Sequence, residues 1–167
     1  IVLTGVLLAP RAGFAQVWCS GEGLQGAVDL YIAAQRKGDT SGLPLPMGAG
    51  YMENAANADI NKGVIRTPMK IDHHRSLIDP STCQTFTEAI VTDKANPYVL
   101  GTRLRVNRDK IAEIEILWTS TGYWLFNADV YLQWSSTEKG GRIPAGLRAG
   151  RGHSTSSPAG GTAFSFR

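Results

Sequence analysis

The sequence has few of the residues that build metal, redox and nucleotide sites. It contains two cysteines and three histidines, and it lacks a phosphate-binding glycine loop, a dinucleotide-binding fingerprint and a Gly-x-Ser-x-Gly motif. Two of the histidines are adjacent, His73 and His74, and the third, His153, is far along the chain. No His-x-His spacing is present, and the scarcity of histidine and cysteine argues against a metal centre.

The sequence also lacks an apolar run long enough to span a membrane. Ile1–Pro10 carry no charge, and Gly13-Phe14-Ala15 place small residues just before Gln16. This pattern is typical of the apolar region and cleavage site of a secretory signal, although a buried strand or helix is the alternative. We therefore expect residues 1–15 to be a signal-peptide remnant, the mature chain to begin near Gln16, and the protein to be secreted and extracellular.

Secretion bears on the two cysteines, Cys19 and Cys83. An even number of cysteines in an oxidising compartment favours a disulfide bond. Such a bond would stabilise the fold by about 4 kcal/mol if it acts by restricting the unfolded chain. Two buried free thiols are the alternative.

Positive charge is concentrated at the end of the chain. Residues 139–167 hold five Lys or Arg and no acidic residue, whereas residues 16–138 hold 11 basic and 14 acidic side chains. The main body therefore offers no basic surface for nucleic acid. The segment 135–167 is rich in Gly, Ser and Arg without periodicity, which predicts a disordered tail.

Residues 16–134 predict one α+β domain. Apolar residues at helical spacing predict a helix over residues 19–38, with Ser20 as its cap and Gly38 at its end. Residues 50–55 predict a short strand, and residues 122–134 a final strand or arm. Four further segments are rich in β-branched and aromatic residues: Ile71–Ile78, Gln84–Thr92, Tyr98–Val106 and Ile111–Thr119. Their short connections predict antiparallel hairpins, and such a sheet, curved around the helix, would leave a cone-shaped pocket.

Several stretches resemble the SnoaL-like, nuclear-transport-factor-2-like superfamily, and more narrowly a family of secreted fungal proteins of unknown function. The resemblance covers roughly residues 19–134. It is carried by "LQGAVDLYIAAQRKGD", "LPLPMGAGYMENAANADINKG", "IDHHRSLIDPSTCQTFTEAIVTD", "PYVLGTRLRVNRDKIAEIEILWT" and "GYWLFNAD". It implies a cone-shaped pocket, dimerisation through the sheet and no obligatory cofactor. Enzymes of this fold act on small apolar or polyketide-like molecules, while many relatives only bind ligands.

The adjacent histidines are candidates for acid–base chemistry. Neighbours in a strand point to opposite faces, so only one of His73 and His74 can face the pocket, and we favour His74. The candidate carboxylate partners are Asp72, Glu53, Glu88 and Asp129. The alternative is a hydrogen-bonded histidine at a dimer face or under a loop.

Other residues could line the pocket. Tyr51 and Glu53 share one face of the first strand, where an inward carboxylate would have a raised pKa; an exposed Glu53 is the alternative. Arg103 could orient an anionic or carbonyl group, or belong to an exposed charge ladder. The aromatic residues Trp118 and Trp124 could line the pocket mouth or be plain core.

In a simple hairpin, Arg103 and Arg105 would face away from Glu113 and Glu115. Either a bulge intervenes, therefore, or these side chains do not pair.

Three functions fit these features. The first is a cofactor-independent lyase or isomerase that moves protons with one histidine, on a small apolar or polyketide-like ligand. The second is a non-catalytic secreted protein that binds such a ligand. The third is an interaction module that forms a homodimer through its sheet.

Overall fold

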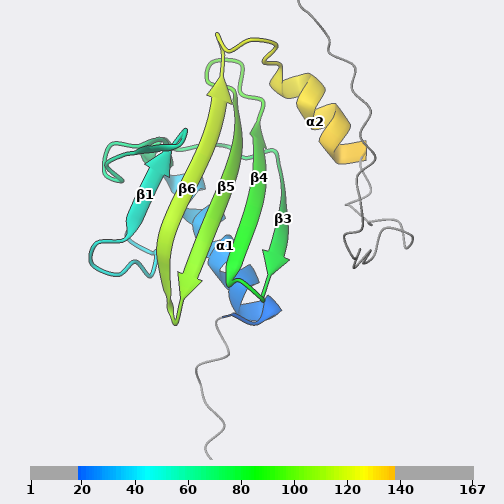
Figure 1. Ribbon diagram of the computed structural model, residues 1–167. Coiled ribbons are helices and arrows are strands. Elements are labelled where there is room, and N and C mark those ends of the chain that lie inside the picture. The colour runs from blue at the N-terminus through cyan, green and yellow to red at the C-terminus, as the bar shows by residue number, and fades with distance from the viewer. Residues whose placement is uncertain (1–18, 138–167) are drawn as a thin grey trace, which may run out of the picture.

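The computed structural model describes residues 19–137. The expected signal remnant, residues 138–167 of the expected tail and His153 lie outside the described residues. In chain order the helices and strands are α1 (Gly21–Lys37), β1 (Gly50–Glu53), β2 (Ala56–Asn57), the 3₁₀ helix η2 (Val64–Arg66), β3 (His73–Asp79), β4 (Gln84–Val91), β5 (Tyr98–Asn107), β6 (Lys110–Ser120) and α2 (Ala128–Thr137) (Figure 1). The two α-helices pack against an open sheet, so the α+β prediction is confirmed. The prediction that the disordered tail begins at residue 135 is wrong, because residues 135–137 belong to the helix α2.

The predicted first helix is confirmed as α1. Its N-terminus is capped by the Ser20 hydroxyl, which accepts a hydrogen bond of 3.1 Å from the backbone N–H of Gly23. Its C-terminus ends at Gly38, which has a left-handed backbone with φ of 64°, a conformation that glycine adopts without a steric penalty. The capping residues and the apolar spacing therefore indicate the same helix boundaries.

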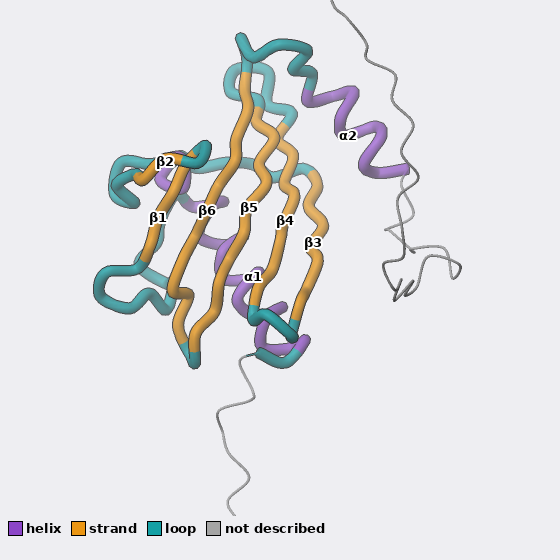
Figure 2. Tube along the Cα trace, viewed as in Figure 1, coloured by secondary structure: helices purple, strands orange, loops and turns teal. Residues whose placement is uncertain are grey.

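The sheet has six strands in the order β2-β1-β6-β5-β4-β3 (Figure 2). The four predicted central strands form antiparallel neighbours, as their short connections require. The short strand β1 instead runs parallel to β6, with Tyr51 opposite Ile114. This pairing joins segments far apart in the sequence, so no local pattern indicates it.

The helix α1 covers one face of the sheet, which we call the inner face. The core between them is made of fully buried side chains, including Leu24 and Val28 from α1 and Leu100, Leu104 and Ile114 from the sheet. The predicted disulfide is confirmed: Cys19 and Cys83 are bonded, with their Cα atoms 4.9 Å apart. It ties the start of α1 to the turn between β3 and β4.

The prediction of a final strand or arm over residues 122–134 is wrong, because most of this segment belongs to α2. The Asn127 side-chain oxygen accepts a hydrogen bond of 3.0 Å from the backbone N–H of Val130 and caps the helix. Two turns precede it, closed by Tyr123 N–H to Ser120 and by Phe126 N–H to Tyr123. These turns end β6, and the cap overrides the strand preference of the aromatic residues.

The helix α2 lies on the opposite, outer face of the sheet. Ala89 of β4 belongs to the core under α1, so its neighbour Glu88 points to the outer face. Glu88 accepts hydrogen bonds from Tyr131 and Ser135 of α2. The sheet is thus sandwiched, in part, between two helices.

Candidate ligand-binding site

The space between α1 and the inner face is filled by side chains. Tyr31 of α1 is fully buried, and its hydroxyl lies 2.6 Å from that of Thr102 on β5. Gln35, also fully buried, donates from its side-chain nitrogen to the carbonyl oxygens of Val64 and Thr67, each at 3.1 Å. The Tyr31 contact joins the helix to the sheet and the Gln35 contacts join it to η2, and the predicted cone-shaped pocket is not confirmed.

The adjacent histidines lie in β3 and point to opposite faces of the sheet. His74 is opposite Ala89 and shares the inner face, whereas His73 is opposite Ile90 and shares the outer face. Burial, followed by the positive charge of Arg36, lowers the pKa of His74. Within residues 19–137, no hydrogen bond or ion pair joins either histidine to a carboxylate.

Two of the candidate carboxylates, Asp72 and Glu88, have partners other than the histidines. Asp72 accepts hydrogen bonds from the Thr92 backbone N–H at 2.8 Å and the Thr92 hydroxyl at 2.9 Å. These bonds lower the pKa of Asp72 and fasten the end of β4 to the residue before β3. Glu88 points to the outer face and pairs with Arg75. Asp129 lies in the first turn of α2.

Tyr51, Glu53 and Trp118 do come together, on the inner face where β1 meets η2. One oxygen of Glu53 accepts hydrogen bonds from the Tyr51 hydroxyl and from the Val64 backbone N–H. Its other oxygen accepts a bond of 3.1 Å from the Trp118 indole N–H. Burial raises the pKa of Tyr51, and its bond to Glu53 adds to the effect.

This three-residue cluster holds η2 against the sheet. Glu53 receives the first free backbone N–H of η2, in the way that an acidic residue caps a helix. Three strands separate Glu53 on β1 from His74 on β3, so the two do not form an acid–base pair. The predicted Tyr51, Glu53 and Trp118 therefore share one location, apart from the histidines.

Arg103 lies on the outer face in a charge ladder that depends on a bulge. The register shifts between Arg105 and Val106, which puts Arg103 and Arg105 on the same face as Glu113 and Glu115. Arg103 bonds Glu115 at 2.9 Å, Gln84 at 3.1 Å, and Glu113. The bulge was one of the two predicted alternatives, and it is the one observed.

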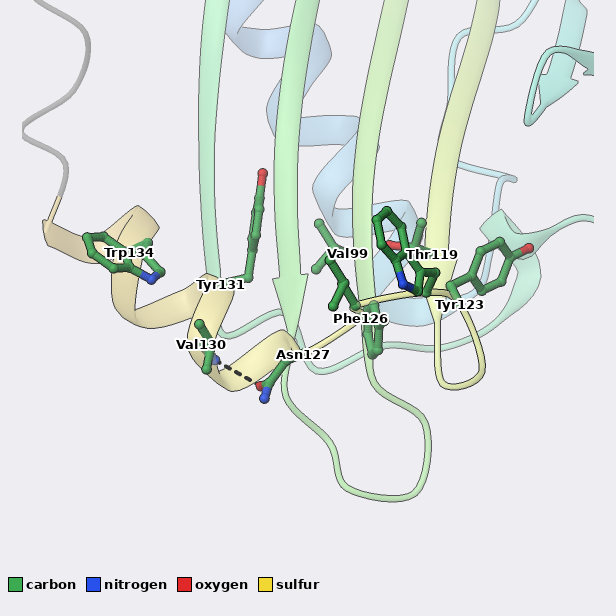
Figure 3. Close-up of a pocket in the computed structure, with 10 residues that line it drawn as sticks. Val99, Thr119, Tyr123, Phe126, Asn127, Val130, Tyr131 and Trp134 are labelled. Atoms are coloured by element: carbon green, nitrogen blue, oxygen red, sulfur yellow. Dashed lines mark hydrogen bonds between the residues drawn. The ribbon is translucent and has the colours of Figure 1, made fainter. Parts of the chain in front are cut away.

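A pocket of about 380 Å³ lies on the outer face, between the sheet, α2 and the loop before α2 (Figure 3). Val99 and Thr119, which are paired on β5 and β6, form its floor. The other lining residues are Tyr123, Trp124, Leu125, Phe126, Asn127, Val130, Tyr131 and Trp134. Of the predicted ligand-binding residues, Trp124 alone lines this pocket.

The walls of the pocket are apolar and aromatic. None of the ten lining side chains is a carboxylate, an imidazole, an ammonium or a guanidinium group. Trp124 is 90% exposed and Trp134 is 67% exposed. Large aromatic side chains such as these contribute most to the free energy of folding or binding when they are buried. The pocket therefore suits an uncharged ring and has no group suited to moving protons near neutral pH.

Glu88 positions the helix that forms one wall. It accepts bonds from the Tyr131 hydroxyl at 3.0 Å and the Ser135 hydroxyl at 2.9 Å. Arg75 of the neighbouring strand binds both of its oxygens, at 3.1 and 3.2 Å. Glu88 is buried, so these four bonds replace the hydrogen bonds that water would make to an exposed carboxylate.

Sequence reasoning missed this pocket because it missed α2. The signal was present: Asn127 precedes Asp129, as at a helix start, and Val130 and Trp134 are four residues apart. The aromatic residues made the segment resemble a strand.

Comparison with protein-family models, with curated proteins and with solved structures yielded no match. Within residues 19–137, no helix has the length and apolar character needed to cross a membrane. The same residues contain no group of three or more His, Cys, Asp or Glu arranged to hold a metal ion.

Proposed function

We propose that this is a secreted, non-catalytic protein that binds small uncharged molecules containing one to three rings. The observation that carries the proposal is the apolar pocket between α2 and the outer face. Its volume of about 380 Å³ is near the lower end of the range for small-molecule sites, about 300–1,000 Å³. The disulfide between Cys19 and Cys83 is compatible with an oxidising, extracellular location.

A ring in this pocket would cover side chains that are now exposed. Trp124 and Trp134 would gain aromatic contacts, each worth about 0.5–1.5 kcal/mol beyond the burial of apolar area. Polar groups of the lining, such as the Thr119 hydroxyl on the floor, could hydrogen-bond a single oxygen or nitrogen of the ligand. A pocket of this kind would select ligands by their shape and aromatic character.

Fluorescence titration of the full chain with N-phenyl-1-naphthylamine, a neutral aromatic probe, tests the proposal. We expect saturable binding that Leu125→Ser weakens about tenfold. Leu77→Ser is the matched control, since Leu125 and Leu77 are 80% and 70% exposed and only Leu125 lines the pocket. Equal effects of the two substitutions would reject the pocket as the binding site.

An acid–base enzyme of lyase or isomerase type is the second candidate, and the lowered pKa of His74 favours it. A neutral imidazole at neutral pH can accept a proton. His74 has no hydrogen-bonded carboxylate within residues 19–137, which is why we place this candidate second. Proton exchange into a candidate substrate, lost in His74→Gln and kept in His73→Gln, would establish it.

Self-association is the third candidate. Leu77, Phe86 and Leu117 are exposed and lie on the outer faces of β3, β4 and β6. A second copy could cover this row. Sedimentation of the full chain and of Phe86→Ser would then show a dimer that the substitution weakens.

A further inference from the structure

The way in which α2 is attached to the sheet differs from ordinary helix packing. Only Ala128 and Ser135 of this helix are buried. Its large apolar side chains Val130 and Trp134 are 46% and 67% exposed. These two side chains therefore contribute little of the apolar burial that usually holds a helix in place.

Polar bonds to one buried carboxylate hold the helix instead. Tyr131 and Ser135 are four residues apart, so they project from the same side of α2. Each donates to a different oxygen of Glu88. Hydrogen bonds to a charged group are stronger than those between neutral groups.

Glu88 can lose these two bonds without being left as an unpaired buried charge. Arg75 binds both of its oxygens from the neighbouring strand β3, which is paired with β4 in the sheet. If the helix lifts, the carboxylate keeps its countercharge, and water can take the two vacated positions. Breaking the contact is therefore far less costly than removing Arg75 would be.

The backbone of the connection between β6 and α2, residues 121–127, suits a hinge about which α2 could change its direction. Gly122 has φ of 98° and Leu125 has φ of 57°. A left-handed backbone is unfavourable for leucine, so lifting of the helix would allow Leu125 to relax. The chain on either side of this connection is regular, in β6 and in α2.

We propose that α2 is a lid over the pocket and that Glu88 is its latch, closed by the hydroxyl groups of Tyr131 and Ser135. Ligand entry and release occur when these two bonds break and α2 moves away from the sheet. The lid rests on the proposed ligand-binding function, whereas the latch is a property of the free protein. The two can therefore be tested separately.

Two single-atom substitutions open the latch and leave the pocket wall intact. Tyr131→Phe removes the hydroxyl and keeps the ring that lines the pocket, and Ser135→Ala changes a residue outside the lining. Their matched controls are Tyr98→Phe, which removes a phenol hydroxyl outside the pocket lining, and Ser136→Ala, whose hydroxyl bonds the Gln133 carbonyl of its own helix. None of the four substitutions removes a core side chain.

The first readout is amide hydrogen exchange of residues 128–137 in the unliganded full chain. We expect exchange to quicken about tenfold in Tyr131→Phe and Ser135→Ala, the scale expected for losing one hydrogen bond to a charged group. The controls should exchange like the wild type. Unchanged exchange in the Tyr131→Phe/Ser135→Ala double variant would overturn the latch, whether or not any probe binds.

The second readout is the rate at which bound N-phenyl-1-naphthylamine is released after dilution in a stopped-flow instrument. The lid predicts faster release in the two latch variants, by a factor similar to that in exchange, and wild-type release in the controls. Faster exchange with unchanged release would overturn the lid. Failure of the wild type to bind the probe would instead contradict the proposed function, and hydrogen exchange would still decide the latch.

Discussion

The hydroxyl oxygens of Tyr31 and Thr102 lie 2.6 Å apart in the centre of the core. Tyr31 comes from α1 and Thr102 from the middle of β5, and both are fully buried. This bond lies where a cone-shaped pocket would have its interior. Tyr31 fills that space and joins the helix to the sheet, which is why we propose a ligand site on the outer face instead.

Tyr31→Phe should lower the free energy of unfolding by about 1–2 kcal/mol, because it leaves the buried Thr102 hydroxyl without this partner. Tyr98→Phe is the matched control, since no hydrogen bond to the Tyr98 hydroxyl occurs within the described residues and its ring is only partly buried. Urea unfolding of both variants measures the difference. Equal free energies of unfolding for the two variants would show that the Tyr31–Thr102 bond makes no net contribution to stability.

Gly63→Ala should destabilise the protein by about 2 kcal/mol or more, because overpacking a tight contact displaces its neighbours. A Cβ at this position would overlap the Glu53 carboxylate and the Tyr51 ring, whereas a Cβ at Gly26 would meet nothing within 4 Å. Gly26 lies within α1, so Gly26→Ala should leave stability unchanged or raise it by up to about 1 kcal/mol. Thermal unfolding of the two alanine variants tests the Glu53 cluster, and a similar Tm for both would argue against it.

The charge ladder on β5 and β6 predicts a loss of stability in acid. Hydrogen bonds from Arg105 and Arg103 lower the pKa of Glu113. A carboxyl group with a lowered pKa in the folded state stabilises the fold fully above its unfolded pKa, about 4.3, and this contribution is lost as pH falls through the folded value. The stability difference between wild type and Glu113→Gln should therefore shrink below pH ~4. A difference that stayed constant from pH 7 to pH 2 would contradict the ladder.

Local patterns predicted the parts of the fold that local chemistry determines. The helix α1 follows from its apolar spacing, the Ser20 cap and Gly38, and the central strands follow from β-branched runs separated by turns. The parallel pairing of β1 with β6 depends on contacts between distant segments. Such contacts leave no periodic trace in either segment.

The candidate site was predicted less well. His73 and His74 lie on opposite faces, as strand geometry requires, and Tyr51, Glu53 and Trp118 do meet. Whether the space under α1 is filled depends on contacts between distant segments, such as that of Tyr31 with Thr102, and no local pattern indicates them. Glu88, a predicted partner for histidine, instead pairs with Arg75 across β3 and β4. Its bonds to Tyr131 and Ser135 depend on α2, which the aromatic pattern does not indicate.

The measurement that tests the account most directly is an NMR titration of the full chain with N-phenyl-1-naphthylamine. The account predicts that amide shifts concentrate at Val99, Thr119 and Val130, around the pocket under α2. Shifts concentrated instead at Tyr31, His74 and Thr102 would place the ligand between α1 and the sheet and contradict it.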